Sequence, residues 1–158
     1  MPRRLPLLAV ILSVAGIIPF IMCGLGAVAT NTVTSLPAVN LLIAYSAIVL
    51  SFLGGVHWGL TLATEHDPAE RPRLLGGVLA AVLSWAVVAV TIYTLHPSLG
   101  LALMIALFIL GVAAEWRAHH RGWVPSGYIG MRIVITVVVV AILVTVLMLR
   151  LIGAHLIF

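Results

Sequence analysis

Three ionisable residues lie at the edges of long apolar runs of the sequence: His57, Glu115 and Arg132. His57 lies near the end of one run, Glu115 follows another, and Arg132 lies near the start of a third. If these runs are helices of one bundle, the three side chains reach a similar depth. A histidine beside a carboxylate can hold or pass a proton near neutral pH, because imidazole titrates there. The sequence therefore predicts a polar cluster, but it does not give the distances within it.

Two interpretations of this cluster stay open. As a lock, a buried histidine bonded to a carboxylate fixes the register of packed helices, and an arginine at a helix end extends its charge to water. As a ligand site, the cluster would bind a lipid headgroup, a quinone or a proton, with Trp58 and Thr61 beside His57. Alanine at His57 separates the two, because loss of the protein from the membrane indicates a lock. Normal levels with lost activity indicate a site.

The stretch around His57 also predicts a close contact between two helices. Its small residues, which we expect to pack against a neighbouring helix, are Ser51, Gly54 and Gly55. On a helix, Gly54 and Thr61 share a face with His57. Glycine lets two backbones approach closely in a membrane, and the imidazole would then find a partner across the contact.

The composition places these residues in a membrane protein. The 158 residues are 63% hydrophobic and 8% charged, whereas a soluble domain has roughly 25% charged residues. So few charges cannot cover the surface of a folded protein of this size in water. All eight basic residues are arginines in short segments between apolar runs. That spacing excludes the continuous basic surface that binds nucleic acid.

Five apolar runs are long enough to cross a bilayer, for which a helix needs about 20 residues. Continuous runs favour helices over barrel strands, in which apolar and polar residues alternate. We therefore predict an all-α bundle of five transmembrane helices in a single domain, 1–158, with Pro19 kinking the first helix. That first run is longer than the core of a usual secretory signal, so we expect it to be retained as a helix. The predicted helices cover residues 5–29, 38–63, 74–95, 98–114 and 128–152.

The arginines predict how the helices are oriented. Seven of the eight fall on one side of the predicted topology, and Arg150 alone lies near the other. Positively charged loops stay on the cytoplasmic side of a membrane. We therefore expect a multi-pass protein of the bacterial inner membrane with a cytoplasmic N-terminus and a periplasmic C-terminus. The seven arginines are Arg3, Arg4, Arg71, Arg73, Arg117, Arg121 and Arg132.

Motifs that carry catalysis or bind metal are absent from the sequence. It contains no HExxH, GxSxG or phosphate-loop pattern, and so no catalytic residue, metal or cofactor is predicted. His119 and His120 suggest metal only weakly, because zinc needs three or four ligands. His66 and Asp67 from another loop could add ligands, but solvated loop residues are the simpler expectation. We expect the basic stretch 117–121 to contact anionic lipid headgroups instead. No acid or arginine lies in the centre of a run, which counts against ion-coupled transport.

These observations leave three classes of function. The first is a non-enzymatic accessory or scaffold protein that packs against a larger membrane complex, such as a respiratory complex, through apolar surfaces such as 134–140. The alternative is a protein that binds or passes a quinone, lipid or anion at the cytoplasmic ends of the second, fourth and fifth helices. A cavity lined by the polar cluster would raise this alternative above the first. A membrane enzyme using His57 and Glu115 as base and acid ranks last, because no substrate pocket is evident.

Three strings of the sequence resemble a family of small bacterial and mitochondrial inner-membrane proteins of unknown function. They are 16–20 (GIIPF), 50–59, which includes FLGGVHWG, and 115–132, which runs from EWR to YIGMR. The resemblance implies a multi-helix inner-membrane protein in which His57 is important, and it brings no established activity. Members often have a Trp-Tyr pair where this chain has Gly127 and Tyr128, so the third string matches less closely.

Overall fold

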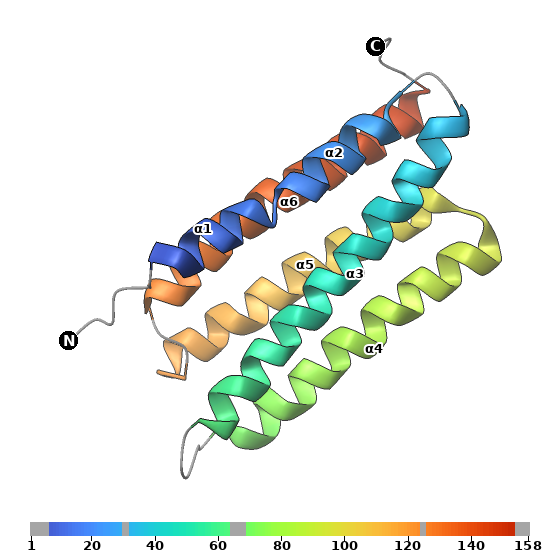
Figure 1. Cartoon of the computed structure of the whole chain (residues 1–158). Coiled ribbons are helices and arrows are strands. Elements are labelled where there is room, and N and C mark those ends of the chain that lie inside the picture. The colour runs from blue at the N-terminus through green and yellow to red at the C-terminus, as the bar shows by residue number, and fades with distance from the viewer. Residues whose placement is uncertain (1–6, 30–31, 64–68, 124–125, 154–158) are drawn as a thin grey trace.

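A computed structural model describes residues 7–29, 32–63, 69–123 and 126–153. The described residues form an all-α bundle (Figure 1). Five stretches of helix are long and apolar enough to cross a membrane, so the predicted fold class is confirmed to that extent. The helices are α1 (Leu7–Ala15), α2 (Ile18–Ala27), α3 (Thr32–Leu62), α4 (Glu70–Thr94), α5 (Pro97–His120) and α6 (Ser126–Ile152).

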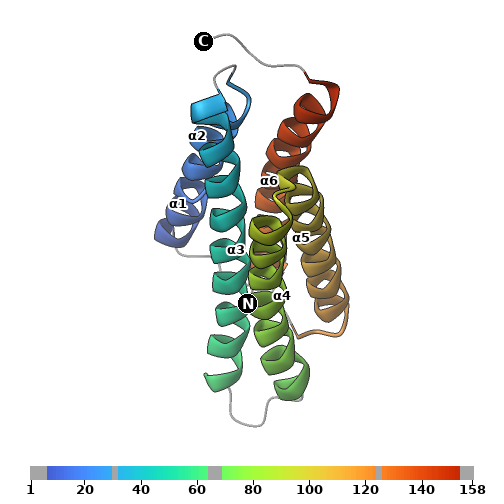
Figure 2. The ribbon, with the colours of Figure 1, turned by 90° about the vertical axis from the view of Figure 1, so that its right-hand side faces the viewer.

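Successive spans run in opposite directions along the bundle (Figures 1 and 2). The helix α3 packs along α4 on one side and along α2 on the other, while α5 packs against α6 and α4. The end of α3, the start of α4, the end of α5 and the start of α6 therefore lie together, at the lower left of Figure 1. We call this the basic end, because Arg71, Arg73, Arg117, Arg121 and Arg132 belong to it.

The first span is broken, as the proline predicts. The helix α1 ends at Ala15, and α2 begins at Ile18 with Pro19 in its first turn. Proline lacks the N–H that would bond one turn back, so the backbone before it needs other partners. The Tyr45 hydroxyl of α3 donates to the carbonyl oxygen of Gly16 at 3.0 Å. The kink is thus tied to the neighbouring helix.

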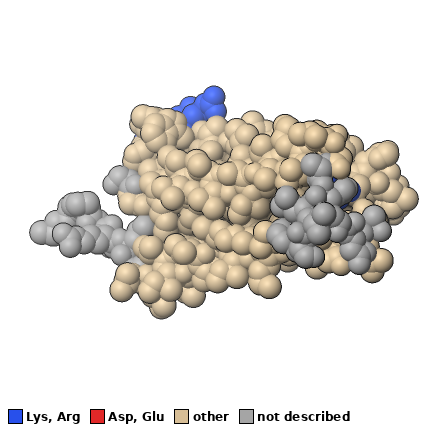
Figure 3. All heavy atoms as spheres, turned by 90° about the horizontal axis from the view of Figure 1, so that it is seen from above, with Lys and Arg blue, Asp and Glu red and all other residues tan. Residues whose placement is uncertain are grey.

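The centre of the bundle is an apolar core, and its exterior is also apolar. Phe20 makes edge-on contacts with Tyr45 and Phe108, at ring-centroid distances of 4.9 and 6.2 Å. On the outside, Trp85 in the middle of α4 is 68% exposed. The face in Figure 3 carries almost no charged side chain. Such a surface is stable only against hydrocarbon, and the helices therefore contact the lipid bilayer.

Two of the predicted loops are largely helical. The second helix begins at Thr32 rather than at residue 38, because Pro37 lies in its second turn and removes only one backbone hydrogen bond. The fourth helix continues past residue 114 to His120. Polar residues end an apolar run without ending a helix, since Glu, Arg and Ala are good helix formers. The extension matters because it places Glu115 within α5 instead of in a loop.

Candidate functional site

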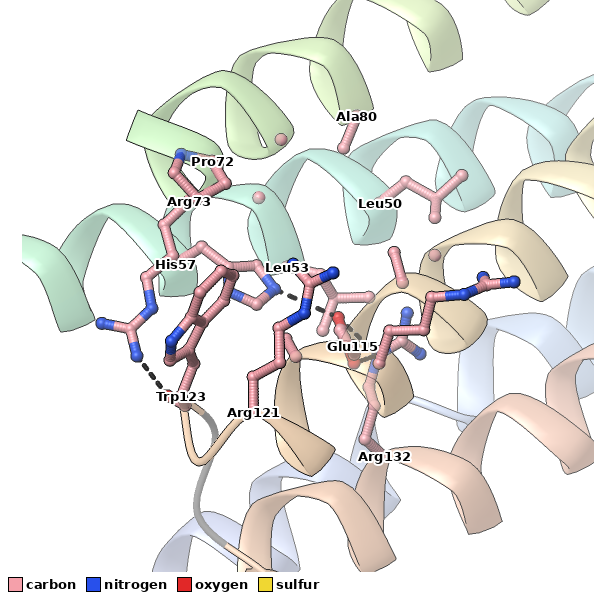
Figure 4. Close-up of a pocket in the computed structure, with 16 residues that line it drawn as sticks. Leu50, Leu53, His57, Pro72, Arg73, Ala80, Glu115, Arg121, Trp123 and Arg132 are labelled. Carbon is pink, nitrogen blue, oxygen red and sulfur yellow. Dashed lines mark hydrogen bonds and ion pairs between the residues drawn. The ribbon is translucent and has the colours of Figure 1, made fainter. Parts of the chain in front are cut away.

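The structure brings His57, Glu115 and Arg132 together from three different helices. His57 Nε2 on α3 donates to Glu115 Oε1 on α5 at 3.3 Å. Arg132 Nε on α6 lies 3.1 Å from Glu115 Oε2 and 3.4 Å from Oε1. Figure 4 shows the carboxylate between the imidazole and the guanidinium. Glu115 is therefore the residue through which α3 and α6 are both joined to α5.

The ion pair in this trio is buried. Glu115 is 6% exposed and Arg132 is 4% exposed. Arg132 Nη1 also donates to the hydroxyl of Thr136, one turn further along α6. Gly111 lies one turn before Glu115, and a Cβ there would be 3.7 Å from Arg132 Nη2, so the guanidinium lies close to the backbone of α5. A buried charge is tolerated only when it is paired and hydrogen-bonded in this way.

Trp58 and Thr61 do not extend the trio as the sequence analysis expects. Trp58 Nε1 donates to the carbonyl of Leu74 on α4 at 3.0 Å, so its ring lies against α4 and not against α5. Thr61 Oγ1 donates to the carbonyl of His57 in its own helix at 3.2 Å. The reason is angular: Trp58 follows His57 by one residue, which turns its side chain by about 100° around the helix.

The predicted close packing occurs between α3 and α4, and Gly55 has no part in it. A Cβ on Gly54 would lie 2.5 Å from the carbonyl oxygen of Gly77. Ser51 Oγ lies 3.4 Å from Ser84 Oγ in the same contact. Gly55 faces outward, and a Cβ there would meet nothing within 4 Å. The expectation that all three small residues pack is therefore wrong for Gly55.

A cavity of about 360 Å³ opens beside the trio at the basic end (Figure 4). Its inner walls carry small and aliphatic residues of α3, α4 and α5. Pro72, Arg117 and Arg121 line it and are exposed, so it reaches the outside of the bundle. Its charged lining residues, together with His57, are Arg73, Arg117, Arg121, Arg132 and Glu115.

The turn after α5 forms part of the cavity wall. Gly122 takes up a φ of 75°, which glycine adopts readily, and turns the chain back at the end of the helix. Arg73 Nη2 on α4 donates to the carbonyl of Trp123. The Arg121 guanidinium lies 5.2 Å from the centre of the Trp123 ring, as in a cation–π contact. The turn is thus fastened across the bundle to α4.

The family of the chain follows from comparison with known proteins. The model of the family described as "Protein of unknown function (DUF3429)" matches residues 5–148. The chain belongs to the DUF3429 family. Transmembrane protein 69 of Xenopus tropicalis is 30% identical to it over 84% of this chain and 50% of that protein. The mouse protein of the same name is 33% identical over 82% of this chain and 51% of that protein.

This DUF3429 chain spans about half the length of those curated relatives. No solved structure matches it. The family match takes in every residue that lines the cavity, from Leu50 to Arg132. The match confirms the predicted resemblance and the multi-pass transmembrane character.

Three arginines of this DUF3429 site were missed as site residues by the sequence analysis. Arg73 served only to predict orientation, and the stretch 117–121 was expected to contact lipid headgroups, but all three arginines line one cavity. The available signal was helical spacing: Arg117 and Arg121 lie four residues apart and so share a face of α5. No sequence pattern pointed to Arg73, because it reaches the cavity only through the packing of α4 against α5.

The histidine pair at the end of α5 lies apart from the cavity lining. The His119 and His120 ring centres are 6.1 Å apart, and the His120 ring packs edge-on against Trp116 at 5.0 Å. Among the described residues, no group of three or more metal-binding side chains occurs. Arg3, Arg4, His66 and Asp67, which entered the predictions of topology and metal binding, lie outside the described residues.

Proposed function

We propose that this protein binds an anionic amphiphile, a molecule with a negatively charged head and an apolar remainder, in the cavity at the basic end. The observation that carries the proposal is the lining of that cavity. It combines four arginines and one glutamate with an apolar inner wall. This favours the binding protein over the scaffold protein, which needs no cavity.

The charge of the lining selects the head of the ligand. Glu115 neutralises Arg132, with which it forms a buried pair. Arg117 and Arg121 then add two positive charges to the cavity lining that Glu115 does not balance. Guanidinium groups bind phosphate and carboxylate groups through two parallel hydrogen bonds. A neutral quinone would gain nothing from this excess of positive charge.

The depth of the cavity accommodates the apolar part of the ligand. Along α4 the lining runs from Arg73 through Gly76 to Ala80, which is about 10 Å at 1.5 Å per residue. Small side chains on α4 and α5 leave this space between the helices. Leu50 and Leu53 of α3 supply apolar surface opposite. A ligand bound here would keep its head at the basic end and its apolar part at the depth of the hydrocarbon.

The trio then has a supporting function. Because Glu115 joins α3 and α6 to α5, it holds three of the four helices that form the cavity wall. Nothing in this arrangement requires a chemical step on the ligand. We therefore infer a non-enzymatic binding protein.

The proposal also includes an orientation. We infer that the basic end faces the cytoplasm of a bacterial cell, with the protein in the inner membrane, because arginine-rich ends are retained on that side. The ligand would then enter from the cytoplasmic leaflet, where anionic lipids and anionic metabolites both occur.

The test is native mass spectrometry of the protein in detergent with added lipids. We expect phosphatidylglycerol to bind in preference to phosphatidylcholine and to ubiquinone. The double variant Arg117→Gln/Arg121→Gln should lose about tenfold or more in phosphatidylglycerol affinity, since each charge-assisted contact contributes about 1.5–3 kcal/mol. Glycerol phosphate without acyl chains distinguishes a free anion from a lipid headgroup as the source of the bound phosphate.

Arg71→Gln is the matched control, because Arg71 is an exposed arginine of the same end that does not line the cavity. It should bind phosphatidylglycerol as the unchanged protein does. Equal binding of phosphatidylcholine and phosphatidylglycerol, or equal loss in Arg71→Gln and in the double variant, would overturn the proposal.

The accessory or scaffold protein remains a second proposal, supported by one observation. Trp85 and Tyr93 on the outer side of α4 are 68% and 89% exposed. Large aromatic side chains of this kind are typical anchors in protein interfaces as well as in lipid. Purification in mild detergent tests it: a protein that always migrates alone argues against a complex, and a stoichiometric partner lost on Trp85→Ala argues for one.

A further inference from the structure

We infer that the ligand is a membrane phospholipid whose head enters the cavity sideways, between α4 and α5, while its acyl chains stay in the bilayer. The inference rests on the proposed function, which leaves the source of the anionic head open, and assigns that source to the lipid phase. The gap through which the head would pass is lined by Gly76 of α4 and Ala114 of α5. We call it the lateral opening.

Two of the three sides of the cavity are closed by contacts between helices. Between α3 and α4, a Cβ on Gly54 would lie 2.5 Å from the carbonyl oxygen of Gly77, so the two backbones touch. Between α3 and α5, His57 bonds to Glu115, and Arg132 of α6 pairs with the same carboxylate. Neither side leaves a path for a lipid head.

The third side, between α4 and α5, is lined by small residues that are exposed. Gly76 lies one turn further into α4 than Arg73, and Ala114 lies one turn before Ala118 on α5. Both Gly76 and Ala114 line the cavity and both are exposed. A Cβ at Gly76 would meet nothing within 4 Å. The cavity is therefore open on this side as well as at the basic end.

The volume of the cavity suits the head of a phospholipid and not its chains. A cavity of about 150 Å³ holds one benzene molecule. In proportion, the volume of about 360 Å³ holds about 14 non-hydrogen atoms. That is room for a phosphate, a glycerol and the first carbons of a chain. The rest of two acyl chains must lie outside, and the lateral opening is the exit that faces hydrocarbon.

An apolar surface continues from the lateral opening into the bilayer. Leu83 lies two turns beyond Gly76, and Leu110 lies one turn before Ala114, so each shares a face with the opening residue of its own helix. Leu83 is 47% exposed and Leu110 is 64% exposed. A chain lying along these leucines is in hydrocarbon both before and after the head binds. Binding therefore never transfers the chain to water, a step that would be costly.

The experiment is photocross-linking in phosphatidylcholine liposomes that contain a trace of phosphatidylglycerol with a diazirine in the middle of one chain. Mass spectrometry of the peptides locates the label. At a constant fraction of probe, unmodified phosphatidylglycerol then replaces part of the phosphatidylcholine. We expect the label at Leu83 and Leu110 to fall at least fivefold, because the probe is displaced from a site. The label at Val134 of α6, which is exposed, should not change, because it reports only surrounding lipid.

Gly76→Trp tests the lateral opening itself, since an indole would fill it. We expect this variant to lose about tenfold or more of the displaceable label at Leu83 and Leu110. Gly55→Trp is the matched control. Gly55 is also an exposed glycine with open space around it, beside the Gly54 contact as Gly76 is beside Gly77, but it does not line the cavity. It should keep the label of the unchanged protein.

Four results would overturn the inference. The first is displaceable label at Leu50 and Leu53, which line the cavity, in place of Leu83 and Leu110. The second is equal label in Gly76→Trp and Gly55→Trp. The third is displacement of the probe by glycerol phosphate as effective as that by phosphatidylglycerol, which would assign the site to a free anion.

These three results leave the proposed function intact, because an anion would still bind at the arginines. The fourth result is label that no added anion displaces at any position. It overturns the proposed function as well when native mass spectrometry also shows no preference for phosphatidylglycerol. Since the unchanged protein alone gives the decisive labelling pattern, the test holds even if Gly76→Trp does not fold.

Discussion

Gly54 of α3 and Gly77 of α4 touch backbone to backbone. A Cβ on Gly54 would lie 2.5 Å from the carbonyl oxygen of Gly77, and a Cβ on Gly77 would lie 2.6 Å from that of Gly54. The contact is one turn from His57, and it fixes the distance between the two helices that form one side of the cavity. Real side chains essentially never approach so closely, so any substitution must separate the helices.

Gly54→Ala should therefore destabilise the protein. We expect a loss of about 1–3 kcal/mol in the free energy of unfolding, typical of overpacking a buried contact. Thermal unfolding in detergent measures it. Gly55→Ala is the control, since Gly55 is exposed with open space around it, and better helix propensity should make it neutral or slightly stabilising. Equal melting temperatures for both variants would contradict the contact.

Glu115→Gln should lower the free energy of unfolding by more than the loss of a surface charge does. It leaves the Arg132 guanidinium buried without its counter-charge. Breaking one partner of a buried pair costs about 3–5 kcal/mol. Urea unfolding or the yield of folded protein in the membrane measures the loss, and Glu70→Gln on exposed α4 surface is the control. The double variant Glu115→Gln/Arg132→Gln should recover part of the stability, whereas additive losses would mean that the two residues do not interact.

Tyr45→Phe tests how the broken first span is held. The change removes the hydrogen bond from the Tyr45 hydroxyl to the Gly16 carbonyl and keeps the ring contact with Phe20. We expect a loss of about 1 kcal/mol, the usual net contribution of such a bond. Tyr93→Phe, on an almost fully exposed tyrosine, should leave the melting temperature unchanged. A melting temperature of Tyr45→Phe as high as that of Tyr93→Phe would show that the bond contributes nothing.

Cysteine labelling tests the orientation. In a Cys23→Ser background, a membrane-impermeant thiol reagent should label His120→Cys at the basic end in inverted inner-membrane vesicles and not in intact spheroplasts. His96→Cys, at the opposite end of α4, should behave in the reverse manner. Both follow from retention of arginine-rich ends in the cytoplasm. Labelling of both positions from the same side would contradict the antiparallel arrangement as well as the orientation.

The sequence by itself determined the class, the spans and the identity of the trio. A chain with so little charge and such long apolar runs folds stably only in hydrocarbon. Because hydrocarbon offers no hydrogen-bond partners, the backbone N–H and C=O groups of each run must bond to one another, as they do in a helix. Pro19 predicts the break in the first span, because proline lacks the N–H that bonds one turn back in a helix. His57, Glu115 and Arg132 stood out because they lie within or directly beside the apolar runs, where an ionisable group is costly.

Only the tertiary structure decided which faces meet. A one-residue step turns a helix by about 100°, so consecutive residues face different helices, and Trp58 contacts α4 whereas His57 contacts α5. For the same reason Gly54 packs against α4, whereas the next residue, Gly55, faces outward. The cavity depends on distances between helices distant in the chain, and no local pattern encodes them. Arg73 therefore joins Arg121 at one cavity through packing alone.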